Sequence, residues 1–129
     1  MTKNALHILV VDDDMLARMT AVQCVKQGGH TAAMADGGAA AMEMLQSDEY
    51  DLVLLDLMMP DVDGFEVLRH IRETPKLSEI PVIVISGSGG AESKAKCLEM
   101  GASGYLSKPL DSELLNEQIL GCMDKTSQT

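Results

Sequence analysis

The hydrophobic residues of this chain form short continuous runs separated by longer stretches with helical spacing. Three runs are rich in Val, Ile and Leu and do not alternate with polar residues: 6–11 (LHILVV), 51–56 (DLVLLD) and 80–86 (IPVIVIS). Runs of this kind are typical of strands that are covered on both faces, as in a parallel sheet. Two shorter runs, 31–35 (TAAMA) and 103–107 (SGYLS), are candidates for strands at the edges of that sheet.

Helical periodicity fills the gaps between these runs. Apolar residues recur at helical spacing in five stretches: 15–25, 40–45, 65–71, 95–100 and 115–122. Glycines follow the first and fourth stretches, Pro75 follows the third, and Asp111 stands where an N-cap would open the last. Alternating strands and helices predict one doubly wound α/β domain over residues 1–129, with its core at about 6–123. Only the tail 124–129 (DKTSQT) is expected to be loose.

Composition and charge narrow the possible functions. The chain has 129 residues, 46% of them hydrophobic and 23% charged, which is typical of one globular domain. A formal net charge of -10 argues against direct binding to nucleic acid or to anionic membranes, because both need clustered Lys and Arg. The apolar run 5–11 is too short for a signal peptide or a membrane span. Cys24, Cys97 and Cys122 are far apart and odd in number, which indicates reduced thiols in a cytoplasmic protein.

Polar residues follow the predicted strands at the positions where ligands are expected. All parallel strands of a doubly wound sheet end at one edge, and ligands bind in the crevice there. Every strand except the second ends in, or is followed by, a residue with useful chemistry: Asp12 and Asp13, Asp56, Ser86, and Lys108. The second strand is followed by Asp36 and Gly37, for which a turn is the better interpretation.

These residue types together predict a site that binds a phosphoryl group. Three carboxylates at one edge repel one another unless a cation joins them, and a few hard oxygen ligands suit Mg²⁺. Lys108 adds a positive charge and Ser86 a hydroxyl donor, so that Asp56 could act as a nucleophile toward phosphorus. A glycine-rich run at 86–93 does not meet the requirements of a P-loop, because no Gly-Lys-Ser/Thr follows it.

Each residue taken alone also has a simpler interpretation. Acids that precede a helix are common caps, and this is the preferred role for Asp14. Asp12 and Asp13 could be caps as well, Lys108 an ordinary surface charge, and Tyr105 a half-buried packing residue. Their shared position at one sheet edge favours the functional interpretation.

Four motifs, in this order and at these separations, resemble the receiver domain of two-component response regulators, the CheY-like family: ILVVDDD, VLLDLMMPDVDG, PVIVISG and GASGYLSKPL. The resemblance covers about Leu6 to Met123. It implies a flavodoxin-like fold, in which a five-stranded parallel sheet of order 2-1-3-4-5 carries helices on both faces.

The resemblance also implies roles for individual residues. Asp56 matches the phosphoacceptor. Asp12 and Asp13 match the acidic pair that holds Mg²⁺ together with Asp56 and the backbone carbonyl of Met58. Ser86 and Lys108 match the hydroxyl and the lysine that meet the phosphoryl group, and Tyr105 matches the aromatic switch residue. Met58 and Ser88 match the two positions whose side chains flank the approach of the water that hydrolyses the aspartyl phosphate. The peptide bond between Lys108 and Pro109 matches one that is cis in the family.

A receiver of this kind takes its phosphoryl group from a sensor histidine kinase or a histidine phosphotransfer protein. Its phosphorylated form would act on a downstream protein or a fused output domain through the face of the fourth helix, fifth strand and fifth helix. It would not be an enzyme beyond self-phosphorylation and slow autodephosphorylation.

Three other functions compete with this one. An aspartyl-phosphate hydrolase would need a second acid two residues after Asp56, where Met58 stands. A flavin or nucleotide module would need stacking aromatics, but the chain has no Trp, two Tyr and one Phe. A degenerate receiver used only for binding would not need the complete set of acceptor, acid pair, hydroxyl and lysine.

Overall fold

The computed structural model describes residues 5–87, 91–108 and 110–127. Strands and helices alternate along them, as predicted. The strands are β1 (His7–Val11), β2 (Thr31–Ala35), β3 (Leu52–Asp56), β4 (Val82–Ser86) and β5 (Gly104–Ser107). The helices are α1 (Met15–Gln27), α2 (Gly38–Ser47), α3 (Gly64–Glu73), α4 (Ala91–Glu99) and α5 (Ser112–Ser127). Ser88 and Pro109, to which the resemblance assigns roles, lie outside the described residues.

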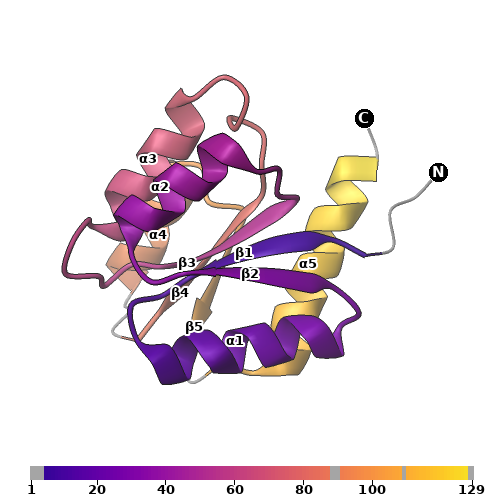
Figure 1. Ribbon diagram of the computed structural model, residues 1–129. Coiled ribbons are helices and arrows are strands. Elements are labelled where there is room, and N and C mark those ends of the chain that lie inside the picture. The colour runs from indigo at the N-terminus through magenta and orange to yellow at the C-terminus, as the bar shows by residue number, and fades with distance from the viewer. Residues whose placement is uncertain (1–4, 88–90, 109, 128–129) are drawn as a thin grey trace.

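The strands form one parallel sheet in the order β2-β1-β3-β4-β5, which confirms the order implied by the resemblance. Helices α1 and α5 cover one face, and α2, α3 and α4 cover the other (Figure 1). The chain order reverses between β1 and β3, so the C-terminal ends of these two neighbouring strands mark the expected ligand crevice.

Alternate residues of each central strand supply two separate cores. Leu9, Leu55 and Val84 pack beneath α2, α3 and α4, whereas Leu54 and Ile83 pack beneath α1 and α5. Because both faces of the sheet are covered, both sets of side chains must be apolar. This explains why the central strands read as continuous hydrophobic runs.

Helices α4 and α5 differ most from the predicted stretches. Helix α4 begins at Ala91, earlier than the predicted stretch 95–100, and α5 continues to Ser127. The tail 124–129 was therefore wrongly expected to be loose, since its first four residues are helical. Each residue added to an existing helix gains a backbone hydrogen bond, and residues 124–127 contain no Gly or Pro to end it.

The predicted cap of α5 is confirmed, because Asp111 Oδ1 accepts hydrogen bonds from the backbone N–H groups of Glu113 (2.9 Å) and Leu114 (3.2 Å). Within the described part of the chain, no helix combines the length and the apolar character needed to span a membrane.

Candidate functional site

Three acidic side chains meet at the C-terminal edge of the sheet. Asp12 follows β1 and Asp56 ends the neighbouring β3. Each of Asp12, Asp13 and Asp56 offers a carboxylate oxygen, and these atoms all lie within 4.8 Å of one another. Asp12 and Asp56 are only 5% and 3% exposed, whereas Asp13 faces solvent. The predicted convergence of the three acids is confirmed.

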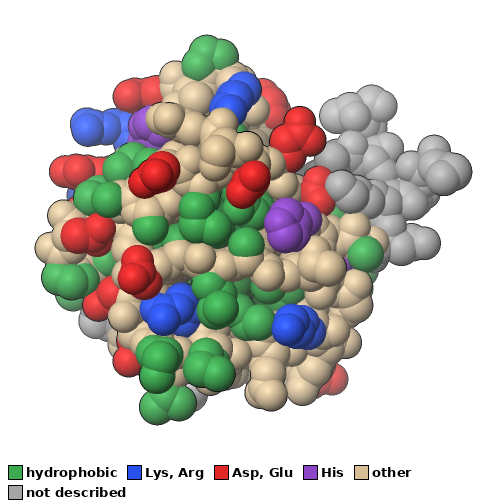
Figure 2. All heavy atoms as spheres, in the orientation of Figure 1, with side chains coloured by type: hydrophobic (Ala, Val, Ile, Leu, Met, Phe, Trp, Pro, Cys, Tyr) green, Lys and Arg blue, Asp and Glu red, His purple; other side chains and the backbone are tan. Residues whose placement is uncertain are grey.

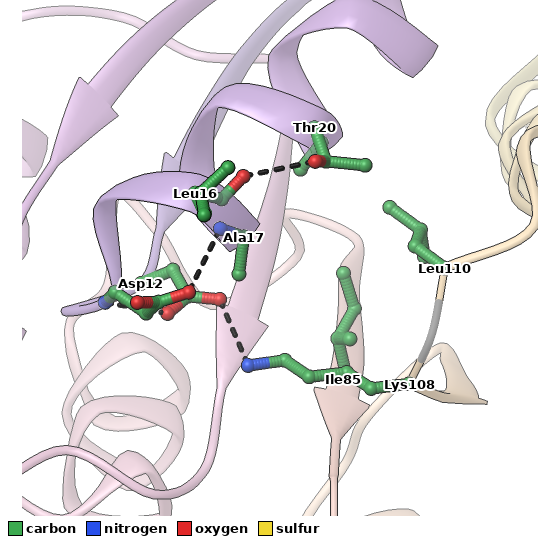
Figure 3. Close-up of a pocket in the computed structure, with 9 residues that line it drawn as sticks. Asp12, Leu16, Ala17, Thr20, Ile85, Lys108 and Leu110 are labelled. Carbon is green, nitrogen blue, oxygen red and sulfur yellow. Dashed lines mark hydrogen bonds and ion pairs between the residues drawn. The ribbon is translucent and has the colours of Figure 1, made fainter.

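Lys108 reaches this cluster from the segment that follows β5 (Figure 3). Its Nζ lies 3.1 Å from Asp12 Oδ2 and 3.6 Å from Asp56 Oδ1. Burial disfavours the lysine charge, but the hydrogen bond to Asp12 and the charge of Asp56 outweigh that effect and raise the pKa of Lys108. Lys108 is therefore a charged partner shared by the two buried acids.

The surroundings of Asp56 shift the pKa of its carboxyl group. Burial, and next the charge of Asp12, raise its pKa to about 6 from the ordinary value of 3.8. The charge of Lys108 and the Met58 N–H, which lies 3.4 Å from Asp56 Oδ1, act in the opposite direction but do not cancel these effects. The site therefore favours the binding of a further cation next to Asp56.

Backbone contacts hold Asp12 in place. Its Oδ1 accepts a hydrogen bond from the Asp14 N–H at 2.9 Å, and its carbonyl accepts one from Arg18 Nη1 at 2.9 Å. The sequence did not single out Arg18, because a surface arginine on a helix gives no signal of its partner. Asp14 is the N-cap of α1, as predicted, since its Oδ2 accepts from the Ala17 N–H at 2.9 Å.

Ser86 and Met58 line the same hollow. Ser86 ends β4, next to β3, and is 2% exposed. A hollow of about 450 Å³ has Ser86, Met58, Phe65 and Ser93 among its lining residues. The Met58 side chain is 66% exposed, so the residue two positions after Asp56 offers solvent an apolar surface.

Tyr105 lies farther along the sheet, on β5. Its ring is half-buried against the core beneath α2, α3 and α4. The hydroxyl oxygen is buried and has no hydrogen-bond partner among the described residues. The switch role of Tyr105 stays a prediction.

A second hollow, of about 220 Å³, lies between α1 and the segment after β5 (Figure 3). Asp12 and Lys108 border it, and its remaining walls are mostly apolar: Leu16, Ala17, Thr20, Ala21, Ile85 and Leu110, with Asp14. Of the site residues, Asp12 and Lys108 therefore face a hollow beside the first turns of α1.

The loop between Asp56 and α3 is tightly closed. The Gly64 N–H donates to the Leu57 carbonyl at 3.1 Å, and a Cβ at Gly64 would come within 2.6 Å of the Asp56 carbonyl oxygen. Asp63 caps α3, and Asp61 reaches across to the start of α2. No sequence pattern indicates this contact between Asp61 and α2, because it joins residues more than twenty positions apart.

Known proteins share both the sequence pattern and the fold. A family model for the response regulator receiver domain matches residues 8–120. The gliding motility regulatory protein of Myxococcus xanthus is 40% identical over 115 residues, which cover 88% of this chain and 15% of that protein. The response regulator MprA of Mycobacterium ulcerans is 34% identical over 122 residues, or 95% of this chain and 52% of that protein. The chain thus spans about half or less of the length of these curated relatives.

Solved structures agree with these relatives. The chemotaxis protein CheY4 of Vibrio cholerae has a TM-score of 0.84 at 25% identity, covering 90% of this chain and 97% of that one. The receiver domain of the Francisella response regulator 1452 has a TM-score of 0.82 at 28% identity, covering 94% and 98%. Since the family model matches nearly the whole folded region, and the sheet order agrees with it, this chain belongs to the response regulator receiver domain family.

Proposed function

We propose that Asp56 is the phosphoacceptor of this receiver domain and takes its phosphoryl group from a phosphohistidine on a kinase or phosphotransfer protein. The observation that carries the proposal is the buried Asp56 carboxylate, grouped with two further acids and held near Lys108. Among the described residues, its hydrogen bond and ion pair both use Oδ1, which leaves Oδ2 for the attack. As Oδ2 bonds to phosphorus, the phosphorus–nitrogen bond breaks and the imidazole leaves with the bonding electron pair.

The acidic cluster also supports a magnesium site. Three carboxylates that crowd one another, one of them with a raised pKa, form the kind of hard, anionic ligand set that Mg²⁺ prefers. Asp12, Asp13, Asp56 and the Met58 carbonyl would hold the ion. When bound, it supplies positive charge to the phosphoryl oxygens. Lys108 supplies a second positive charge from the protein itself.

Asp13→Ala should weaken Mg²⁺ binding on the order of 100-fold, because it removes one of three carboxylates and even outer-shell partners of a metal contribute 10–100-fold. Asp14→Ala should leave Mg²⁺ binding unchanged and lower the free energy of unfolding by about 1 kcal/mol, because it removes only the α1 cap. Calorimetric titration with MgCl₂ and urea unfolding measure the two effects. The reverse result would mean that Asp14, and not Asp13, is the second acid of the metal site.

Phosphorylation would then change the conformation of the domain. The new charge draws the Ser86 hydroxyl and the Lys108 ammonium toward the phosphoryl oxygens, and Tyr105 responds to the movement of Ser86. We propose that the face of α4, β5 and α5 carries this change to a downstream protein or a fused output domain. The half-buried Tyr105 and the exposed Leu98 on α4 support that choice of face.

An apolar surface beside the site suits a protein donor. Hydrophobic side chains gather over the N-terminal end of α1, at the lower left of Figure 2, where Met15, Leu16 and Met19 are exposed. Leu16 also lines the hollow that Asp12 and Lys108 border. Exposed apolar patches of this kind mark protein contacts, so we propose that the phosphohistidine protein docks there.

The direct test is phosphorylation of the purified chain by acetyl phosphate with Mg²⁺, followed by intact-mass analysis. One added phosphoryl group is expected. Steady release of phosphate from a phosphate ester, without a stable labelled protein, would instead favour a hydrolase. We propose that no such turnover occurs, because the position two residues after Asp56 carries Met58 in place of a second acid.

We also propose that this domain is cytoplasmic and does not bind nucleic acid or membranes directly. The free, buried thiols of Cys24 and Cys97 support a reducing, cytoplasmic location. The net charge of -10 supports the absence of direct nucleic acid or membrane binding by this domain.

Met58→Asn should speed the loss of the phosphoryl group by on the order of tenfold. Hydrolysis needs a water in line with phosphorus, and the exposed thioether of Met58 offers it no useful hydrogen bond. The expected gain is below the 10²–10⁴-fold of a full general base, because an amide only orients the water. The measurement is the decay of phosphorylated protein after donor removal at fixed Mg²⁺. Unchanged or slower decay in the variant would mean that Met58 does not control access of water.

A further inference from the structure

Asp61 connects the loop after Asp56 to a different element of the fold. Its Oδ1 accepts a hydrogen bond from the Gly38 N–H at 3.2 Å, and its Oδ2 accepts one from the Ala39 N–H at 3.2 Å. These groups open α2, whose own N-cap, Gly37, offers no side-chain cap. The Ala39, Val62 and Gly38 N–H groups lower the pKa of Asp61, so it is an anion at neutral pH.

The fit between Asp61 and α2 is close. A Cβ at Gly37 would lie 2.8 Å from Asp61 Oδ2 and 3.0 Å from Asp61 Cγ. The backbone at Gly37 is extended, with φ -177° and ψ 175°, so any residue could adopt it. A side chain at Gly37 would therefore push the Asp61 carboxylate away from its present position, whereas the backbone conformation would not oppose it.

The loop held by this contact is the one that carries Met58. Its ends are closed by short-range contacts, the Gly64 N–H to the Leu57 carbonyl and the Asp63 cap of α3. Between these ends, Asp61 joins the loop to an element more than twenty residues away in the sequence. The Met58 N–H lies against Asp56 Oδ1, so a displaced loop would move a group that contacts the acceptor carboxylate.

We infer that Asp61 is a positioning residue for the phosphoacceptor site: by capping α2 from the loop 57–63, it fixes the Met58 backbone next to Asp56. The inference rests on the proposed magnesium site, in which the Met58 carbonyl is a ligand. Groups that orient the first ligands of a metal affect its binding without touching it. Asp61 acts through the loop and touches neither Mg²⁺ nor phosphorus.

Two variants of the full chain break the contact from opposite sides. Asp61→Ala removes the carboxylate, and Gly37→Ala keeps the carboxylate but puts a methyl group where it lies. Each should weaken Mg²⁺ binding about tenfold, the low end of the effect of outer-shell partners. The double variant should bind Mg²⁺ no more weakly than either single variant, because both act through one contact. Gly37→Ala tests the inference even where Asp61→Ala does not fold.

Asp111→Ala is the matched control, because it also removes an exposed aspartate that accepts hydrogen bonds from two N–H groups at a helix start. It should lose stability but keep the Mg²⁺ affinity of the wild type. The measurements are calorimetric titration with MgCl₂ and hydrogen exchange of the Met58 amide in metal-free buffer. Met58 exchange should be faster in Asp61→Ala and Gly37→Ala and unchanged in Asp111→Ala.

The outcomes separate this inference from the proposed function. If the wild type binds Mg²⁺, an affinity in Asp61→Ala or Gly37→Ala equal to that of Asp111→Ala overturns the positioning role and leaves only a helix cap. If the wild type does not bind Mg²⁺, the proposed metal site fails, and Met58 exchange alone decides. Unchanged exchange in both variants would then overturn the role, and faster exchange would support it.

Discussion

Asp56→Asn should abolish phosphorylation of this domain by acetyl phosphate. The carboxylate at position 56 is the proposed nucleophile, and an amide oxygen cannot form a stable acyl phosphate by the same substitution. Intact-mass analysis after incubation with donor and Mg²⁺ should show one phosphoryl group on the wild type and none on the variant. Phosphopeptide mapping of the wild type should assign the group to Asp56.

A suitable control for this loss is Asp111→Asn. The change removes one carboxylate away from the cluster, and asparagine caps a helix about as well as aspartate. It should be labelled like the wild type. Equal labelling of Asp56→Asn and the wild type would mean that the reactive group is elsewhere in the chain.

Asp56→Asn should also stabilise the metal-free protein at pH 7, by about 2 kcal/mol. The pKa of Asp56 is raised from 3.8 to about 6 in the folded state, so the ionised form is less favourable folded than unfolded. The stability contributed by the bound proton is present below pH 3.8 and is lost as the pH rises through about 6. At about 1.4 kcal/mol per pKa unit the full effect would be about 3 kcal/mol, of which asparagine recovers part, because it keeps the shape without the charge.

Urea unfolding in the presence of a chelator, at pH values between 4 and 7, measures this difference. The advantage of Asp56→Asn should shrink toward pH 4, where the wild-type carboxyl is protonated in the folded state. Added Mg²⁺ should also narrow the stability difference at pH 7, because an ion that the folded wild type binds more tightly than the folded variant stabilises the wild type more. A wild type that is as stable as the variant at pH 7 without metal would contradict the charge crowding described for Asp12, Asp13 and Asp56.

The two expectations have one physical origin. Burial of Asp56 beside another acid costs folding free energy, and it also creates a site where added positive charge is strongly favoured. In the proposed function, phosphorylation needs that ion and that carboxylate together. The folding free energy that the buried Asp56 carboxylate costs is therefore coupled to the proposed function, a trade-off known for strained functional sites.

The sequence by itself determined the strands, the helices and the candidate site residues. Continuous apolar runs such as 51–56 predicted strands buried on both faces, because a covered sheet needs apolar side chains on each side. The positions of Asp12, Asp56 and Lys108 at or just after the ends of predicted strands then predicted the cluster, because parallel strands end at one edge. The strand order followed from the resemblance to a family and not from the hydrophobic pattern.

Only the tertiary structure decided the contacts that tune the site. The raised pKa of Asp56 depends on its burial and on the closeness of Asp12, which is 44 positions earlier in the chain. The Arg18 contact to the Asp12 carbonyl and the Asp61 cap of α2 likewise join residues whose separation in the sequence does not follow the periodicity of a helix or a strand. Periodicity reports which face of an element is buried, because it follows the geometry of one helix or strand. Distances between side chains of different elements depend on how the whole chain packs, and no local pattern records them.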